Sequence, residues 1–99
     1  MRSRHDDEVM AEIYRKDPAL ALGMLNDILE DGDQGDLLIV LRQLTHAFGG
    51  VQAVAKHAQL NPTQLYRTLS ADGNPALSSL TAILKAMGLR LAVQALKNA

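Results

Sequence analysis

The stretch Val51–Leu69, VQAVAKHAQLNPTQLYRTL, decides how this chain folds. Its first half carries four small or apolar residues at the i, i+3, i+4, i+7 spacing of one helical face: Val51, Val54, Ala55 and Ala58. After Gln59-Leu60, Asn61 is a good N-cap, and Pro62 suits the first helical position, which needs no backbone N–H. The stretch therefore predicts two short helices joined by a tight turn.

The second of these helices has an apolar side and a polar side. Leu65 and Leu69 recur at i, i+4, so the helix turns them inward. The opposite face carries side chains that can form hydrogen bonds: Thr63, Gln64, Tyr66 and Arg67. A short helix with such a free face can enter the major groove of DNA. The alternative is a helical hairpin of an ordinary α-domain that binds no DNA.

The spacing resembles the helix-turn-helix of the Cro and lambda-repressor class. Ala55 is small enough for the two helices to approach closely. The apolar positions of the motif are filled by Val54, Ala58, Leu60 and Leu65. Gln59 stands where that class usually has Gly, at a position whose backbone tends to positive φ.

Length and composition indicate one compact domain. The chain has 99 residues, 47% of them apolar, which suffices for one modest core. The absence of Cys excludes disulfides, thiolate zinc sites and thiol catalysis, and fits a reducing cytoplasm. The start, MRSRHDDEV, lacks the apolar run of a signal peptide, and no stretch has the roughly 20 apolar residues that span a bilayer. We therefore expect a cytoplasmic protein without a membrane partner.

The net charge of −1 conceals a strong asymmetry. Residues 1–36 hold ten acidic and four basic residues, whereas residues 37–99 hold one acidic and six basic residues. The predicted helix-turn-helix lies in the basic part, and such asymmetry is a hint of nucleic-acid binding. It fits equally well an acidic solvated helix beside a basic one.

The acidic part, residues 1–32, predicts a helical hairpin. One helix should cover 6–16, with an apolar stripe of Val9, Met10 and Ile13. Asp17-Pro18 should start a second helix that ends at Asp31-Gly32. Its inward residues would be Leu22, Leu25, Ile28 and Leu29. The hairpin either only covers the core or also docks a basic partner protein.

Residues 33–99 should form the rest of the same domain. Asp33 can cap a central helix whose buried positions would be Leu37, Leu41, Leu44 and Phe48, before Gly49-Gly50 stops it. Turn formers fill residues 70–75, and Ser78 or Ser79 can cap a last helix carrying Leu80, Ile83, Leu84 and Met87. Segment 89–94 is either a short strand paired with its copy in a second subunit, or an irregular tail. The result is an all-α fold of five or six helices.

The chain also resembles a narrower family, the bacterial antidote proteins of HigA-type toxin–antitoxin addiction modules. The resemblance is carried by the run L-Y-R-x-L-S-x-D-G-N-P at residues 65–75 and by Ala86-Met87-Gly88-Leu89-Arg90-Leu91. Asp17-Pro18 and the turn Glu30-Asp31-Gly32-Asp33 also match. The chain departs from the family pattern early in the second motif helix and at Ala76-Leu77.

This resemblance implies a lambda-repressor-like homodimer that binds double-stranded operator DNA and represses its own operon. It also implies neutralisation of a small basic ribonuclease toxin of the RelE and HigB type. The alternatives are a phage-type or stand-alone repressor without a toxin, and a protein-interaction adaptor that does not bind DNA. The antitoxin is our prediction, because the run at residues 65–75 is long and far more specific than a bare helix-turn-helix pattern.

We predict that Thr63, Gln64 and Arg67 contact base edges, because Gln can pair with adenine and Arg with guanine through two hydrogen bonds. The predicted phosphate contacts are Gln52, Asn61 and Tyr66, with Ser70 and Lys56 as further candidates. Arg90 could contact DNA or support a dimer.

No pattern indicates a catalytic site, a cofactor or a metal. His5, His46 and His57 lack the spacing of a metal site, and no carboxylate is placed to complete one. Neither a Ser–His–Asp arrangement nor a Gly-rich phosphate loop occurs. We therefore expect a binding protein rather than an enzyme.

Overall fold

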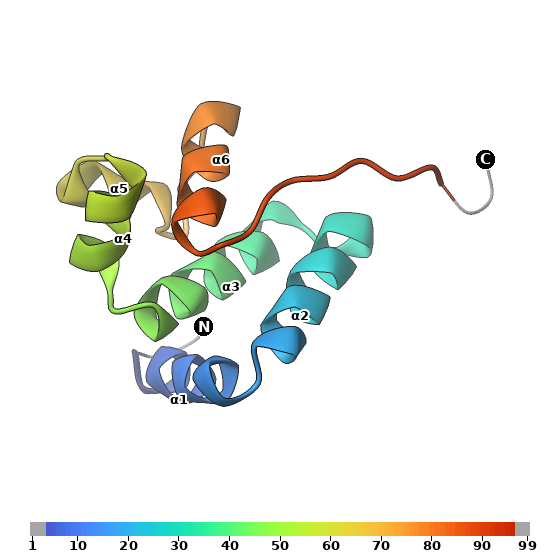
Figure 1. Ribbon diagram of the computed structural model, residues 1–99, viewed down its shortest axis with the longest axis horizontal. Coiled ribbons are helices and arrows are strands. Elements are labelled where there is room, and N and C mark those ends of the chain that lie inside the picture. Colours follow the sequence, from blue (N-terminus) through green and yellow to red (C-terminus); the bar gives the residue numbers. More distant parts are fainter. Residues whose placement is uncertain (1–3, 97–99) are drawn as a thin grey trace.

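A computed structural model describes the backbone of residues 4–96 and the side chains of residues 6–96. Within this range the all-α prediction is confirmed, with six helices and no strand (Figure 1). The helices are α1 Arg4–Lys16, α2 Pro18–Asp31, α3 Gln34–Ala47, α4 Val51–Ala58, α5 Pro62–Thr68 and α6 Leu77–Ala86.

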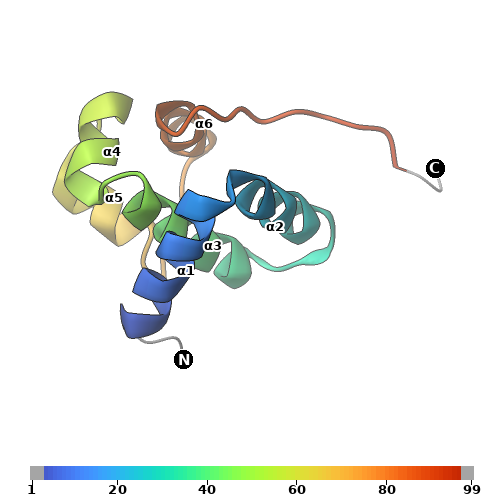
Figure 2. The same ribbon diagram turned by 60° about the horizontal axis from the view of Figure 1, so that its bottom comes forward.

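Helix α3 lies at the centre of the fold. Helices α1 and α2 pack on one side of it, whereas α4 follows on the other side and packs against α5 and α6 (Figures 1 and 2). The bend between α3 and α4 measures 94°. It is made by Gly49 and Gly50, whose φ values of 107° and 99° suit residues without a Cβ. These two glycines therefore direct the chain from the N-terminal helices into the predicted DNA-binding pair.

Side-chain caps fix the starts of three helices, α2, α3 and α5. The Asp17 side chain accepts a hydrogen bond from the backbone N–H of Leu20 at 3.3 Å, and the Asp33 side chain accepts one from Asp36 at 2.8 Å. The prediction that Ser78 or Ser79 caps α6 is wrong. The helix begins earlier, at Leu77, because the Leu80 N–H already bonds to the Ala76 carbonyl at 2.9 Å.

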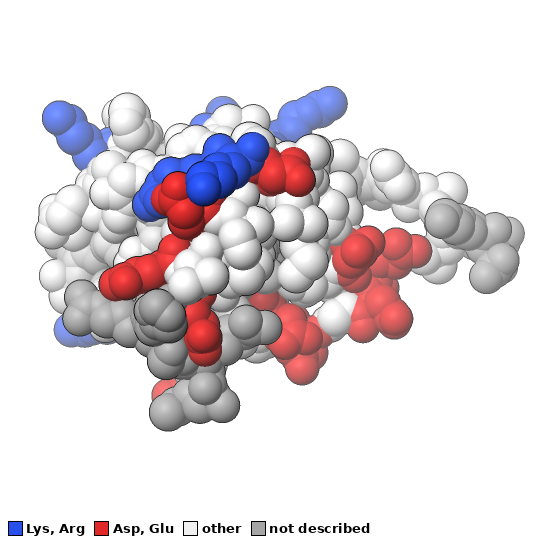
Figure 3. All heavy atoms as spheres, turned by 90° about the horizontal axis from the view of Figure 1, so that it is seen from below, with Lys and Arg blue, Asp and Glu red and all other residues white. Residues whose placement is uncertain are grey.

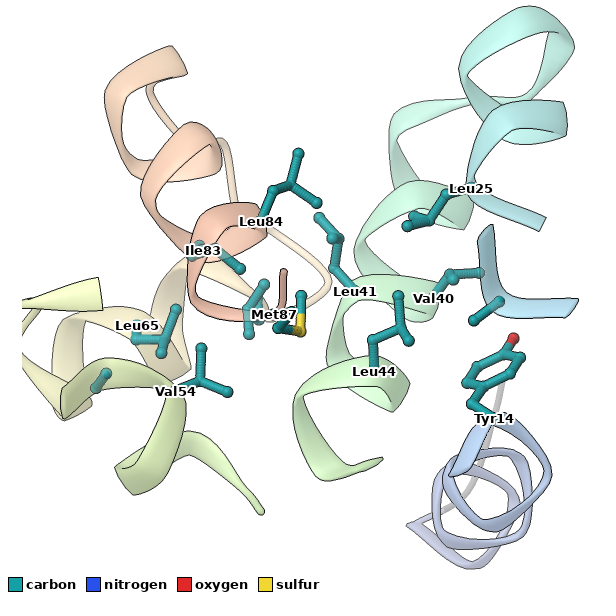
Figure 4. Packing of buried hydrophobic residues seen from close by; sticks show 13 residues of the cluster. Tyr14, Leu25, Val40, Leu41, Leu44, Val54, Leu65, Ile83, Leu84 and Met87 are labelled. Carbon is teal, nitrogen blue, oxygen red and sulfur yellow. The ribbon is translucent and has the colours of Figure 1, made fainter. Parts of the chain in front are cut away.

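The core is continuous across α3 (Figure 4). Leu41 and Leu44 are buried between Tyr14 and Leu25 on one side and Ile83 and Met87 on the other. Leu41 and Leu44 are buried as predicted, whereas Leu37 is only half-buried. Phe48, directly after the last residue of α3, is an exception. Its N–H still bonds to the Leu44 carbonyl at 3.0 Å, but 51% of its surface is exposed, because its side chain borders an open groove instead of a packed helix.

The predicted inward faces of α1 and α2 are partly wrong. In α1, Val9 and Ile13 are 44% and 38% exposed, and the face turned to α3 consists of Asp7, Met10, Ala11 and Tyr14. In α2, Leu25 is buried as predicted and Ile28 is half-buried, but Leu22 and Leu29 are exposed. Both helices turn a small residue, Ala11 or Ala21, toward α3, which allows a close approach that a leucine stripe would prevent.

Segment 89–94 forms no strand in the described chain. The Leu89 N–H bonds to the Leu84 carbonyl at 2.8 Å, and the backbone then runs away from the globule in an extended, irregular path (Figures 1 and 2). No single helix within residues 4–96 combines the length and apolar character needed to cross a membrane. Helices α3 and α4 meet that test only when taken together across their bend.

Candidate nucleic-acid interface

The turn between α4 and α5 has the geometry expected of a helix-turn-helix. Gln59 lies in the left-handed region, with φ 58° and ψ 42°, and is the one non-glycine residue of the described chain with positive φ. The Leu60 N–H bonds to the Ala55 carbonyl at 2.9 Å, which closes the end of α4. Ala55 is fully buried, so its methyl group sets how closely the two helices approach.

Helix α5 is held by its cap and by two leucines behind it. The Asn61 Oδ1 accepts a hydrogen bond from the Gln64 backbone N–H at 3.1 Å, and Pro62 occupies the first turn. Leu65 and Leu69 are each only 1% exposed, as the i, i+4 spacing predicts. A seven-residue helix gains little stability by itself, so its orientation depends on these tertiary contacts.

The outward face of α5 is open to solvent. Thr63, Gln64 and Arg67 are exposed, and Tyr66 is 69% exposed, far more than an aromatic side chain in a core. This is the arrangement that a helix needs to reach base edges. No Asp or Glu occurs between residues 51 and 69, so no carboxylate of α4 or α5 would repel a phosphate backbone.

The predicted phosphate-binding residues near this face differ in exposure and in whether their hydrogen-bond donors are already engaged. Gln52, in the first turn of α4, and Lys56 are exposed. The side-chain Oδ1 of Asn61 caps α5, which leaves the NH₂ group of the same side chain as the donor for a phosphate. Ser70 is half-buried, and its hydroxyl donates to the Arg67 carbonyl at 2.6 Å, so this donor is already engaged.

The acidic residues lie in residues 1–36, except for Asp72 in the loop after α5. They gather on the face seen from below in Figure 3, over α1 and around the connection between α2 and α3. Lys and Arg side chains lie on this face as well (Figure 3). Within the described residues, no group of three His, Cys, Asp or Glu side chains could hold a metal ion. The side chain of His5, weighed with the other histidines above, lies outside these residues.

A buried polar network behind α5 was not predicted from the sequence. Arg42 of α3 donates to the Asp7 carboxylate at 3.1 Å and to the Leu69 carbonyl at the end of α5 at 3.0 Å. Gln43 donates to the other Asp7 oxygen at 3.2 Å and accepts from the Tyr14 hydroxyl at 3.3 Å. No local pattern could reveal this network, since its partners are 27 to 36 residues apart.

The loop after α5 is pinned by a glycine and a glutamine. A Cβ on Gly73 would lie 1.9 Å from the Thr68 carbonyl oxygen, so no other residue fits there without moving the backbone. The Gln34 amide donates to the Gly73 carbonyl at 3.0 Å and to the Asn74 side chain at 3.3 Å. The run D-G-N-P at residues 72–75 thus ties the end of α5 to the start of α3.

Comparison with known families gives one match, over residues 7–95, to the family described as probable addiction module antidote protein. The chain belongs to this family. The match covers all six helices almost completely, and it confirms the resemblance drawn from the L-Y-R-x-L-S-x-D-G-N-P run. Neither a search of curated proteins nor a search of solved structures returned a match.

Membership of the antidote family implies a protein partner for this chain. An antidote, or antitoxin, is the member of an addiction module that counteracts a toxin, so a cognate toxin is the partner that the family implies. The family match includes the acidic helices α1 and α2 as well as α4 and α5. The family match therefore includes most of the acidic segment, residues 1–36, and most of the basic segment, residues 37–99.

Proposed function

We propose that this antitoxin binds operator DNA through α5, represses its own operon as a homodimer and neutralises a small basic ribonuclease toxin. The observation that supports DNA binding most directly is the outward face of α5. Thr63, Gln64 and Arg67 are exposed there, while Leu65 and Leu69 anchor the opposite side of the same short helix.

In this proposal Gln64 and Arg67 read bases, because their side chains can each form two hydrogen bonds with a purine edge. Thr63 contacts bases beside them. Gln52, Asn61 and Tyr66 hold phosphates on either side of the groove. Ser70 lies at its margin, and its hydroxyl must leave the Arg67 carbonyl to donate to a phosphate. A single short helix contacts few base pairs, so two copies on neighbouring half-sites would supply the affinity and the length of the operator.

The toxin contact is supported by the family and by the acidic face of α1 and α2. A protein with a basic surface is attracted to such a face. Among the described residues, helices α1 and α2 make no contact with α4 or α5, which carry no carboxylate. The same chain could then hold DNA and toxin on different surfaces.

DNA binding is tested by fluorescence anisotropy on the fragment upstream of this gene, in a series of salt concentrations. Substitution R67A should lower the affinity at least tenfold, since it removes a bidentate base contact. The matched control is K16A, which removes one positive charge from the exposed end of α1. Equal affinities for R67A and the unmodified protein would exclude α5 as the reading helix, and no binding at all would favour the adaptor alternative.

Toxin neutralisation is tested with the reading frames that flank this gene. Expression of the toxin alone should stop growth, and co-expression of this chain should restore it. If neither neighbour encodes a small basic growth inhibitor, the stand-alone repressor becomes the better account of DNA binding.

A further inference from the structure

An open apolar groove lies where the N-terminal helices meet the end of α3. Its volume is about 290 Å³, and its main lining residues are Tyr14, Pro18, Leu22, Leu44, Phe48 and Leu89. Leu22 and Phe48 at its rim are 46% and 51% exposed. An engineered apolar cavity of roughly 150 Å³, left by one leucine, takes up a benzene molecule, so this groove has room for about two aliphatic side chains.

The groove offers no free charge to a ligand. Arg15 is the one charged residue along it, and its guanidinium is already engaged. Arg15 donates to the Ala47 and His46 carbonyls at 3.2 Å each and pairs with Glu12 at 2.5 Å. The chemistry of the groove therefore favours an uncharged aliphatic occupant over an ionic one.

The same chain carries such an occupant. Residues 90–96, which we call the C-terminal arm, have the sequence RLAVQAL and contain no acidic residue. Val93 is 99% exposed and Leu96 is 79% exposed, although both are apolar. Figures 1 and 2 show the arm projecting beyond the globule from its root at Leu89, which itself borders the groove.

The arm is unsuited to fill the groove of its own chain. Leu89 is fixed by its backbone hydrogen bond to Leu84, and Leu91 is still half-buried against the core of its own chain. The arm is exposed from Ala92 onward. A return of Val93 to the groove would require a reversal directly after Leu91, where the chain has no Gly, Pro, Asn or Asp to form a tight turn. A second copy can supply its arm without any reversal.

We propose that two copies of this chain exchange their C-terminal arms, and that Val93 and Leu96 of each arm occupy the apolar groove of the other copy. Arg90 and the acidic helix α2 have opposite charges, which favours the same pairing. The exchange is reciprocal, so one contact surface occurs twice and closes a two-fold dimer. This inference rests on the homodimer of the proposed function and names the surface that forms it.

Disulfide trapping tests the contact directly, since the chain has no cysteine of its own. Protein carrying L22C is mixed with protein carrying V93C or L96C under mild oxidation. We expect a covalent heterodimer with at least one arm variant. The matched control is L20C, another exposed leucine of α2 that does not line the groove, and it should give none. Equal trapping by L20C and L22C would overturn the proposal.

Sedimentation of the full chain supplies the second test. The unmodified protein should have twice the 10.7 kDa mass of one chain, whereas L22E and V93D should each weaken self-association at least tenfold. A mixture of L22E and V93D should recover dimer, because one intact arm still meets one intact groove. A monomeric unmodified protein, or a dimer indifferent to both substitutions, would refute arm exchange. Leu22 and Val93 do not lie on α5, so a failure of arm exchange would not refute DNA binding through α5. That proposal is tested separately by R67A.

Discussion

Arg42 and Leu69 lie 27 residues apart in the sequence, yet the Arg42 Nη1 donates a hydrogen bond to the Leu69 carbonyl at 3.0 Å. Leu69 closes α5, so this bond satisfies one of the carbonyls that every helix end leaves free. The same guanidinium holds the Asp7 carboxylate of α1 at 3.1 Å. One arginine of the central helix therefore connects the acidic N-terminal helix to the end of the proposed reading helix.

We expect R42M to destabilise the protein by about 2–4 kcal/mol, because it leaves the buried Asp7 carboxylate without its cation and the Leu69 carbonyl without its donor. The substitution D7N/R42M should recover part of this loss, since an amide carries no charge to bury. Urea unfolding measures both effects. As a control, E8Q alters an exposed carboxylate of the same helix and should change stability by no more than about 0.5 kcal/mol. An R42M midpoint equal to that of E8Q would contradict the assignment.

We expect G73A to lower stability by about 2–3 kcal/mol, because its Cβ would overlap the Thr68 carbonyl and force the loop off α5. The control G23A makes the same chemical change in the middle of α2, where nothing lies within 4 Å of the added Cβ. It should stabilise the protein by about 0.5–1 kcal/mol, since Ala loses less backbone entropy in a helix than Gly. Thermal unfolding of the two variants should thus shift in opposite directions, and shifts of the same sign would show that the loop is not fixed as described.

The parts of the fold that sequence reasoning recovered are those with local causes. Asn61-Pro62 and Asp17-Pro18 mark helix starts through groups three residues away at most. Leu65 and Leu69 face inward because a short helix with one apolar pair has a single way to pack. Because Leu65 and Leu69 face the core, the side chains on the opposite side of α5 are exposed to solvent.

The errors occur where the deciding partner is distant in the sequence. Helix α1 turns Asp7 inward instead of Val9, and the reason is Arg42, 35 residues away. Phe48 continues the spacing of α3 and keeps its hydrogen bond to Leu44, but it is exposed because no helix of the described chain packs over that end of the face. The polar network and the apolar groove both arise from the meeting of three or more elements, which a single stretch of sequence cannot reveal.

We expect Q59G to stabilise the protein by about 0.5–1 kcal/mol. Gln59 has a left-handed backbone, which costs an ordinary residue about 1–2 kcal/mol. Glycine removes this cost, but it also has more conformational freedom in the unfolded state, and this offsets part of the gain. The control Q59A keeps a Cβ in the same conformation and should gain nothing. Chemical unfolding compares the three proteins. A gain for Q59A as large as that for Q59G would mean that the Gln59 side chain, rather than its backbone, carries the strain.

The two kinds of DNA contact proposed for α4 and α5 should separate in a salt series. Gln64 is assigned to a base edge, so Q64A should relax discrimination at one base pair by about 1–3 kcal/mol while leaving the salt dependence unchanged. Lys56 is exposed on α4 and is a further phosphate candidate. If it holds one phosphate, K56A should weaken binding to every sequence equally and reduce the slope of log affinity against log salt by about 0.9. The measurement is anisotropy on a panel of single base-pair variants at several salt concentrations. If Q64A and K56A changed the affinities across the panel in the same way, the assignment of base contacts to α5 and phosphate contacts to α4 would be contradicted. Only a base contact should depend on the identity of the base pair.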